Sequence, residues 1–180
     1  DAQQGQRRLM AGHLALQLDP MLRAQRLVAT EQPRLSGSER GDPVSLTADE
    51  LSVLLSPDGW SERLFAVGNV HAVAHGANRN DRVDAGRVEV EMTPRTNQPR
   101  QLIASQNVVA DSDAPGGLKR KLSTSTLEIQ FAPGGSRGQL HITSATTPAA
   151  TLDWQDPGDL SAKTLASHMH LSSQHLDANF

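Results

Sequence analysis

The residues of this chain most able to carry chemistry are its seven histidines. His168 and His170 form an H-x-H motif, which places both imidazoles on one face of a strand, a spacing used by some metal sites. A third ligand is not identifiable, and a solvated C-terminal strand explains the motif more simply. His71 and His75 have no carboxylate pair near them in the sequence. We therefore expect no metal site.

Other catalytic patterns fail on their context. No serine lies in a G-x-S-x-G turn, and no serine, histidine and acid stand in the order of a known triad. Gly116-Gly117 and Gly134-Gly135 punctuate turns and not a strand-to-helix phosphate loop. Several acids alternate with apolar residues, which is typical of a solvated strand face: Asp49, Glu50, Glu89, Glu91 and Glu128. We expect a non-enzymatic protein without a cofactor.

Composition excludes further classes. The 180 residues carry 17 basic and 20 acidic side chains for a net charge of −3, so there is no basic field for nucleic acid. Three Phe, two Trp and no Tyr leave few platforms for stacking bases. The absence of cysteine excludes a disulfide scaffold and a thiol nucleophile. The chain opens at Asp1, which we interpret as a processed form or a piece of a longer protein.

The elements that would position any site are repeated. One series begins with "LTADELSVLL", and the third residues of its copies lie 37, 39 and 38 positions apart: Ala48, Ala85, Thr124 and Ala162. An interleaved series includes "LFAVGNV", and the third residues of its copies lie 37, 38 and 38 apart: Ala29, Ala66, Ala104 and Ile142. This predicts a hairpin of about 38 residues, repeated about four times.

Each copy has the pattern of a β-strand. Val88, Val90 and Met92 alternate with acids, and this period of two predicts one apolar and one polar face. "MLRAQRLVA" has helical propensity, but it aligns with the repeat as a strand. The N-terminal copy lacks a clear first strand and the last copy lacks its second.

A change of parity recurs inside the first series. The apolar residues before the change, Leu46 and Ala48, have even sequence numbers. Those after it have odd numbers: Leu51, Val53 and Leu55. A straight strand would place the two sets on opposite faces. We predict a bend or β-bulge at Asp49-Glu50 and at Gly86-Arg87, and a matching kink at Gly68-Asn69. Hairpins with a common fold line would stack and bury their apolar faces between two sheet halves. The expected fold is all-β and elongated with open edge strands, a single domain over residues 1–180.

The repeat resembles a known family. "LTADELSVLLSPDGWSERLFAVGNVHAV" (Leu46 to Val73) and the weaker "VDAGRVEVEM" and "RQLIASQNVVA" are similar to the OstA/LptA family of lipopolysaccharide-transport proteins, which includes LptA, LptC and the N-terminal domain of LptD. The similarity extends with decay from about Leu27 to Leu165. Gly68-Asn69 matches the family phrase, Gln106-Asn107 keeps only the Asn, and Ser144-Ala145 keeps neither.

The resemblance implies a folded-over β-jellyroll with an apolar groove, located in the periplasm. Similar proteins hold the acyl chains of lipid A in the groove and associate end to end through their edge strands. The implied ligand is lipopolysaccharide or another lipid. The implied protein partners are other proteins of this fold, and the chain is expected to associate head to tail with itself. The residues expected to line the groove are Leu51, Val53, Leu64, Ala66, Val88, Val90, Leu102, Ala104, Leu127, Ile129, Phe131, Leu140 and Ile142.

A second interpretation stays open. The same residues could pack against one another as a closed core. The chain would then be a structural β-repeat module, such as a scaffold or adhesin segment, with protein partners only. An apolar cavity continuous along the strands would favour transport, and a solid core would favour the module.

Overall fold

In the residues that the structure describes, fourteen antiparallel strands form one open sheet, which confirms the all-β prediction. The computed structural model describes residues 8–39, 42–76, 79–96, 98–134, 139–158 and 166–179. Within them there is no α-helix, and a single 3-10 turn, η1, covers Pro115–Gly117. The strands are β1 (Arg8–Met10), β2 (His13–Leu18), β3 (Ala24–Thr30), β4 (Arg34–Glu39), β5 (Asp42–Thr47), β6 (Glu50–Leu55), β7 (Ser61–Gly76), β8 (Arg79–Thr93), β9 (Gln98–Asp113), β10 (Lys119–Gly134), β11 (Gln139–Thr147), β12 (Ala150–Asp156), β13 (Ser167–Ser173) and β14 (Leu176–Asn179).

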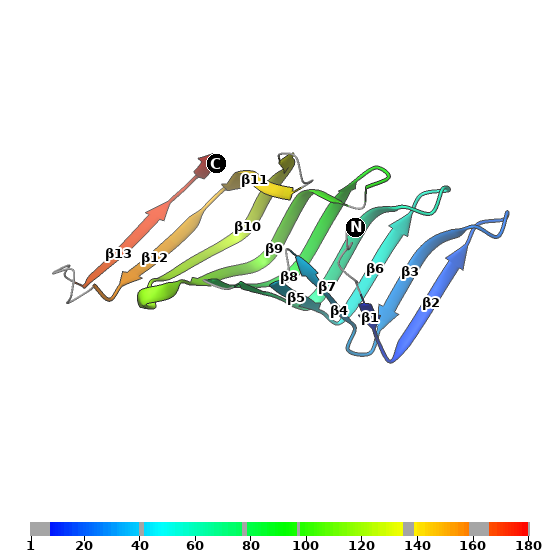
Figure 1. The fold of residues 1–180 in the computed structure, drawn as a ribbon, viewed down its shortest axis with the longest axis horizontal. Coiled ribbons are helices and arrows are strands. Elements are labelled where there is room, and N and C mark those ends of the chain that lie inside the picture. The colour runs from blue at the N-terminus through cyan, green and yellow to red at the C-terminus, as the bar shows by residue number, and fades with distance from the viewer. Residues whose placement is uncertain are drawn as a thin grey trace.

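The pairing divides this sheet into two halves that share the long strands β7 to β10. Half-sheet I has the order β2-β3-β6-β7-β8-β9-β10-β11-β14. Half-sheet II has the order β1-β4-β5-β7-β8-β9-β10-β12-β13. The strands follow one another along the long axis of the molecule, with β2 and β13 toward opposite ends (Figure 1). Nine strands at about 4.8 Å spacing make each half-sheet about 38 Å long.

A line of β-bulges separates the two halves. In the β7–β8 pair the register breaks between Val67 and Val70, so that Gly68 and Asn69 together oppose one residue, Gly86. Gly68 has φ 75° and Asn69 has φ 46°. The predicted kink at Gly68-Asn69 is therefore confirmed, and so is the break at Gly86-Arg87.

The same left-handed pair recurs at two other places along the chain. Gln106 and Asn107 in β9 have φ 68° and 58°, and Glu31 and Gln32 between β3 and β4 have φ 61° and 60°. The predicted bend at Asp49-Glu50 falls between β5 and β6. The repeat thus places a left-handed pair at the fold line about every 38 residues, with or without a glycine.

At each of these corners a glycine faces a polar side chain of the neighbouring strand. The side chain of Asp49 covers Gly68 where a Cβ would stand, Glu31 covers Gly12, and Gln106 covers Gly86. Asn69 Nδ2 donates to Asp49 Oδ2 at 2.9 Å, and the Asp49 amide donates to the Gly68 carbonyl at 2.8 Å. These contacts let the two strands approach closely at the bend.

The core follows the fold line. Ala29, Ala66 and Ala104 have no exposed surface, and Val70 and Val108 are almost fully buried. Small side chains therefore fill the interior at the fold line, and larger residues such as Leu46 and Leu102 pack against them farther out. Because most core residues are small, each corner stabilises the fold modestly and the repeat multiplies the effect.

The two ends differ from the prediction. At the N-terminus β1 and β2, separated by Ala11-Gly12, supply the strand that the sequence analysis lacked. The "MLRAQRLVA" segment contributes β3, so the strand prediction there is confirmed. The segment that begins at Leu160 lies largely outside the described residues, and the strand beside β12 is β13, which begins at Ser167, later than the spacing predicts.

The fourth corner also comes later than predicted. Ser144 and Ala145 lie inside β11, and the chain turns at Pro148-Ala149, where the missing Pro N–H ends the strand pairing. Thr147 is fully buried there, and its hydroxyl contacts the Thr124 hydroxyl in place of an Ala or Val contact. Ser144 and Ala145 instead continue the pairing with β10, opposite Gln130 and Ile129.

Candidate apolar binding face

Ten of the thirteen residues predicted to line a groove share one face of half-sheet I in two cross-strand rows. The first row is Leu51, Ala66, Val88, Ala104 and Leu127. The second row, one step farther from the fold line, is Val53, Leu64, Val90, Leu102 and Ile129. In both rows each residue lies opposite the next. The period of two and the repeat spacing together therefore brought these residues to one surface.

The other three lie elsewhere on the sheet. Phe131 pairs with Ile142 one step farther from the fold line, and Leu140 pairs with Pro133 beyond it. Ala145, not Leu140, is the residue opposite Ile129. Thr143 is an extra unpaired residue in β11, which contributes to this shift of register.

A facing apolar row on half-sheet II was not among the predicted groove residues. It crosses all nine strands through consecutive register pairs: Leu9, Leu35, Leu46, Ala72, Val83, Ala110, Leu122, Leu152 and Leu171. The sequence contained a signal for it, because Leu46, Val83 and Leu122 each open a copy of the first repeat series. Together the rows form what we call the apolar face.

Exposure rises with distance from the fold line. Leu51 is 2% exposed, whereas Val53, Val90 and Ile129 in the second row are half-buried. At the two ends of the sheet Leu16 of β2 and Leu171 of β13 are about half exposed. Such a face can contact an aliphatic chain along its length without directional bonds.

The opposite face of half-sheet I is polar and internally paired. Glu89 accepts from Arg63 at 3.1 Å, and Glu128 accepts from Gln101 Nε2 at 2.7 Å. The hydrogen bond from Arg100, at 2.6 Å, lowers the pKa of Glu91 below its usual value. The predicted solvated acidic face is thus present, and these carboxylates have donor partners.

Several histidines also have polar partners. His170 Nδ1 lies 2.6 Å from Asp153 Oδ1, and His168 Nε2 lies 3.9 Å from the same oxygen. The hydrogen bond with His170 lowers the pKa of Asp153. His71 has a carboxylate partner that the sequence did not reveal, Asp84, at 2.7 Å. Among the residues described by the structure, no group of three or more His, Cys, Asp or Glu could hold a metal ion.

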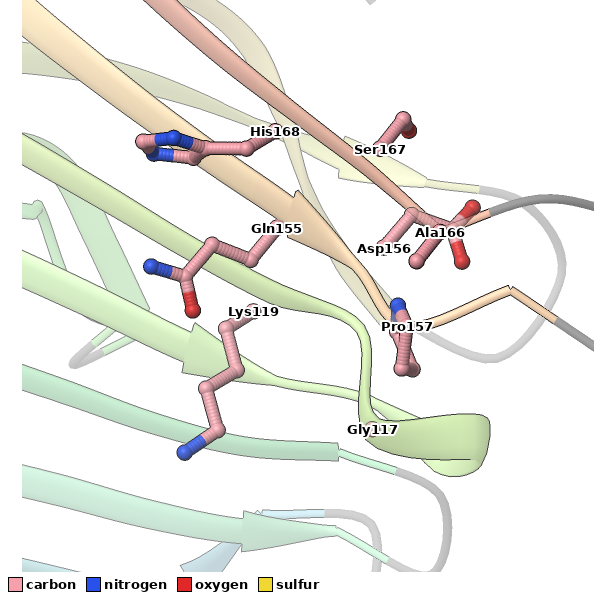
Figure 2. A pocket seen from close by; sticks show the side chains of 8 residues that line it. All are labelled: Gly117, Lys119, Gln155, Asp156, Pro157, Ala166, Ser167 and His168. Carbon is pink, nitrogen blue, oxygen red and sulfur yellow. The ribbon is translucent and has the colours of Figure 1, made fainter.

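Two cavities lie in half-sheet II near the C-terminus and not along the apolar face. The first, of about 510 Å³, lies beside the turn at Gly117 and the end of β12. In Figure 2 the side chains of Lys119, Gln155 and His168, on three adjacent strands, project to the same side. The second, of about 640 Å³, includes these three residues and extends to His75 across the sheet. Both are lined mainly by polar side chains.

Comparison of the chain with family models, curated proteins and solved structures finds no match. Over the described ranges, the structure contains no helix of the length and apolar character needed to cross a membrane.

Proposed function

We propose that this chain is a non-enzymatic lipid-binding protein of the bacterial periplasm, which carries lipopolysaccharide by holding its acyl chains against the apolar face. The observation that carries the proposal is the registered row of half-buried aliphatic residues on half-sheet I, faced by a second aliphatic row on half-sheet II. The sequence resemblance to the OstA/LptA family supplies the ligand and the location.

The physics of the face suits that ligand. Removing a methylene from water is worth about 0.8 kcal/mol, so a chain of about a dozen carbons supplies up to about 10 kcal/mol before losses. Restricted motion of chain and side chains reduces this considerably. Small aliphatic side chains hold an acyl chain without a fixed register, which a transport path requires.

The open ends of the sheet support an association between copies. β2 and β1 end the sheet on one side, and β14 and β13 end it on the other. Over the described residues no further strand pairs with these outer strands, so their outer backbone groups are available to one. We propose that copies of this chain, or other proteins of the same fold, join head to tail through these strands and prolong the apolar face.

Photocrosslinking tests the lipid site with matched neighbours. A photoreactive residue is placed at Val90 or Ile129 on the apolar face, and at Glu89 or Glu128 one residue away on the polar face. Lipopolysaccharide should crosslink at Val90 and Ile129 several times more strongly than at Glu89 and Glu128. Equal yields at both members of each pair would contradict the proposal.

A structural module with a closed core is the second candidate function. Neither described cavity lies along the apolar face, which favours this alternative. The same crosslinking experiment separates the two, because a closed core gives no lipid adduct at either face.

A further inference from the structure

Half-sheet II carries a second cross-strand row, one step farther from the fold line than the Leu122 row. Its side chains change from small and apolar to charged and aromatic along the sheet. Through consecutive register pairs it runs Gly37, Val44, Ala74, Asp81, Ser112, Arg120, Trp154 and Met169. It continues the same surface as the Leu122 row, since Arg120 and Leu122 lie two residues apart on one strand. One strongly basic side chain therefore borders the apolar face, about 6–7 Å from its aliphatic row.

Arg120 is held in place by an aromatic ring. Its guanidinium carbon lies 4.6 Å from the centroid of the Trp154 ring, on the adjacent strand. Stacking of this kind leaves the N–H edges of the guanidinium directed outward. In the part of the chain that the structure describes, no carboxylate forms an ion pair with Arg120, and Asp81 of the same row is paired with Arg79 at 2.6 Å.

Arg120 lies between a polar and an apolar region of the surface. Ser112 is its partner on β9, and Arg120 lines the cavity of about 640 Å³ together with Asp81 and Asp113. On the other side, Trp154 and Leu152 of β12 lie opposite Arg120 and Leu122, and Met169 and Leu171 follow on the edge strand β13. Met169 and Leu171 are 48% and 46% exposed. On half-sheet I, Phe131 and Ile142 pair with each other one step beyond the second aliphatic row.

We propose that Arg120, stacked on Trp154, binds the anionic head of an amphiphile whose acyl chain lies along Leu122, Leu152 and Leu171. The ligand class is a single-chain or multi-chain lipid with a phosphate or carboxylate head. This inference rests on the proposed function, and it orients the lipid: the chain points toward the fold line and the head lies at the outer edge of half-sheet II. An unpaired guanidinium beside aliphatic residues complements an oxyanion joined to an alkyl chain.

The strand itself provides a matched control. Lys119 is the next residue on β10 and carries the same charge, but it projects to the other face of the sheet with Gln155 and His168 (Figure 2). Arg120→Gln and Lys119→Gln therefore change the net charge equally on opposite faces, and Arg120→Gln also removes the stacking on Trp154. Arg120→Lys keeps the charge at the proposed site.

Calorimetric titration with three ligands of equal chain length tests the inference: dodecyl phosphate, dodecanoate and dodecyl maltoside, each below its micelle concentration. The wild-type protein should bind at least one of the two anions about three- to tenfold more tightly than the maltoside. Arg120→Gln should abolish this preference, Arg120→Lys should keep part of it, and Lys119→Gln should leave it unchanged.

Three results would overturn the inference while leaving the proposed function standing: equal wild-type affinity for all three ligands, an unchanged preference in Arg120→Gln, or an equal loss in Lys119→Gln. Absence of binding by the wild-type protein to all three ligands would instead overturn the proposed function, and the inference with it. The relative affinity for dodecyl phosphate and dodecanoate identifies the head that Arg120 prefers.

Discussion

Gly68→Ala tests the account of the fold line. Gly68 has φ 75°, and the Asp49 side chain occupies the place that a Cβ would need. A non-glycine residue in the left-handed region costs about 1–2 kcal/mol. Displacing the side chain of Asp49, with its hydrogen bond from Asn69, adds about 1–3 kcal/mol. We expect the free energy of unfolding to fall by about 2–5 kcal/mol.

Gly59→Ala is the matched control, because Gly59 has φ 84° and nothing within 4 Å of its would-be Cβ. It carries only the backbone cost of about 1–2 kcal/mol. Urea unfolding followed by circular dichroism gives both values by linear extrapolation. For a chain of this size, a loss of about 3 kcal/mol corresponds to about 6–12 °C in Tm.

The excess cost at Gly68 should be traceable to Asp49. Asp49→Gly should destabilise the Gly68→Ala protein less than it destabilises the wild type, with a coupling of about 1–3 kcal/mol. Equal costs for Gly59→Ala and Gly68→Ala, together with additive effects of the two substitutions, would refute the proposed close packing at the bend.

Three further outcomes follow from the same geometry. Gly86→Asp alone should lower the free energy of unfolding by about 1–3 kcal/mol, because the Gln106 side chain covers Gly86. Adding Gln106→Gly should recover most of this loss, because the double variant reproduces the Asp49–Gly68 arrangement. Urea unfolding of the two single variants and the double variant checks this. Leu51→Ala should cost about 2–5 kcal/mol, because Leu51 is buried, whereas Leu54→Ala on the polar face should cost about 1 kcal/mol or less in the same assay. The pKa of Asp153 in the folded protein lies below its usual value of 3.8. The Asp153 carboxylate therefore stabilises the fold above pH 3.8, and this contribution is lost as the pH falls through the folded-state pKa. The free energies of unfolding of wild type and Asp153→Asn, measured from about pH 6 to about pH 2, should converge at the acid end.

The sequence was sufficient for the parts of the fold that repeat. The alternation in Val88, Val90 and Met92 fixes a two-faced strand, and the parity change between Ala48 and Leu51 fixes the place of the bend. Both depend on local backbone geometry, which each copy specifies for itself. Ten predicted residues consequently lie in two rows on one half-sheet.

The parts that the sequence missed depend on contacts between copies. The left-handed pair at Gln106-Asn107 contains no glycine, so only its alignment with Gly68-Asn69 indicates it. The bulge at Thr143 and the corner at Pro148 change the spacing of the last copy. The preceding residues contain no pattern that predicts this change. The row from Leu9 to Leu171 on half-sheet II emerges only when the register of every strand pair is known.

One measurement tests the central claim, that the apolar face receives the acyl chain, most directly. The chain has three isoleucines, Ile103, Ile129 and Ile142, so a spectrum of the protein with labelled isoleucine methyl groups contains three signals. Ile129 lies on the apolar face, Ile142 lies at its rim, one step beyond the second row, and Ile103 lies on the other face opposite Glu128. A fatty acid with a nitroxide on its acyl chain should broaden the Ile129 signal strongly, affect Ile142 at the rim, and leave Ile103 sharp. Broadening of Ile103 equal to that of Ile129 would contradict the account.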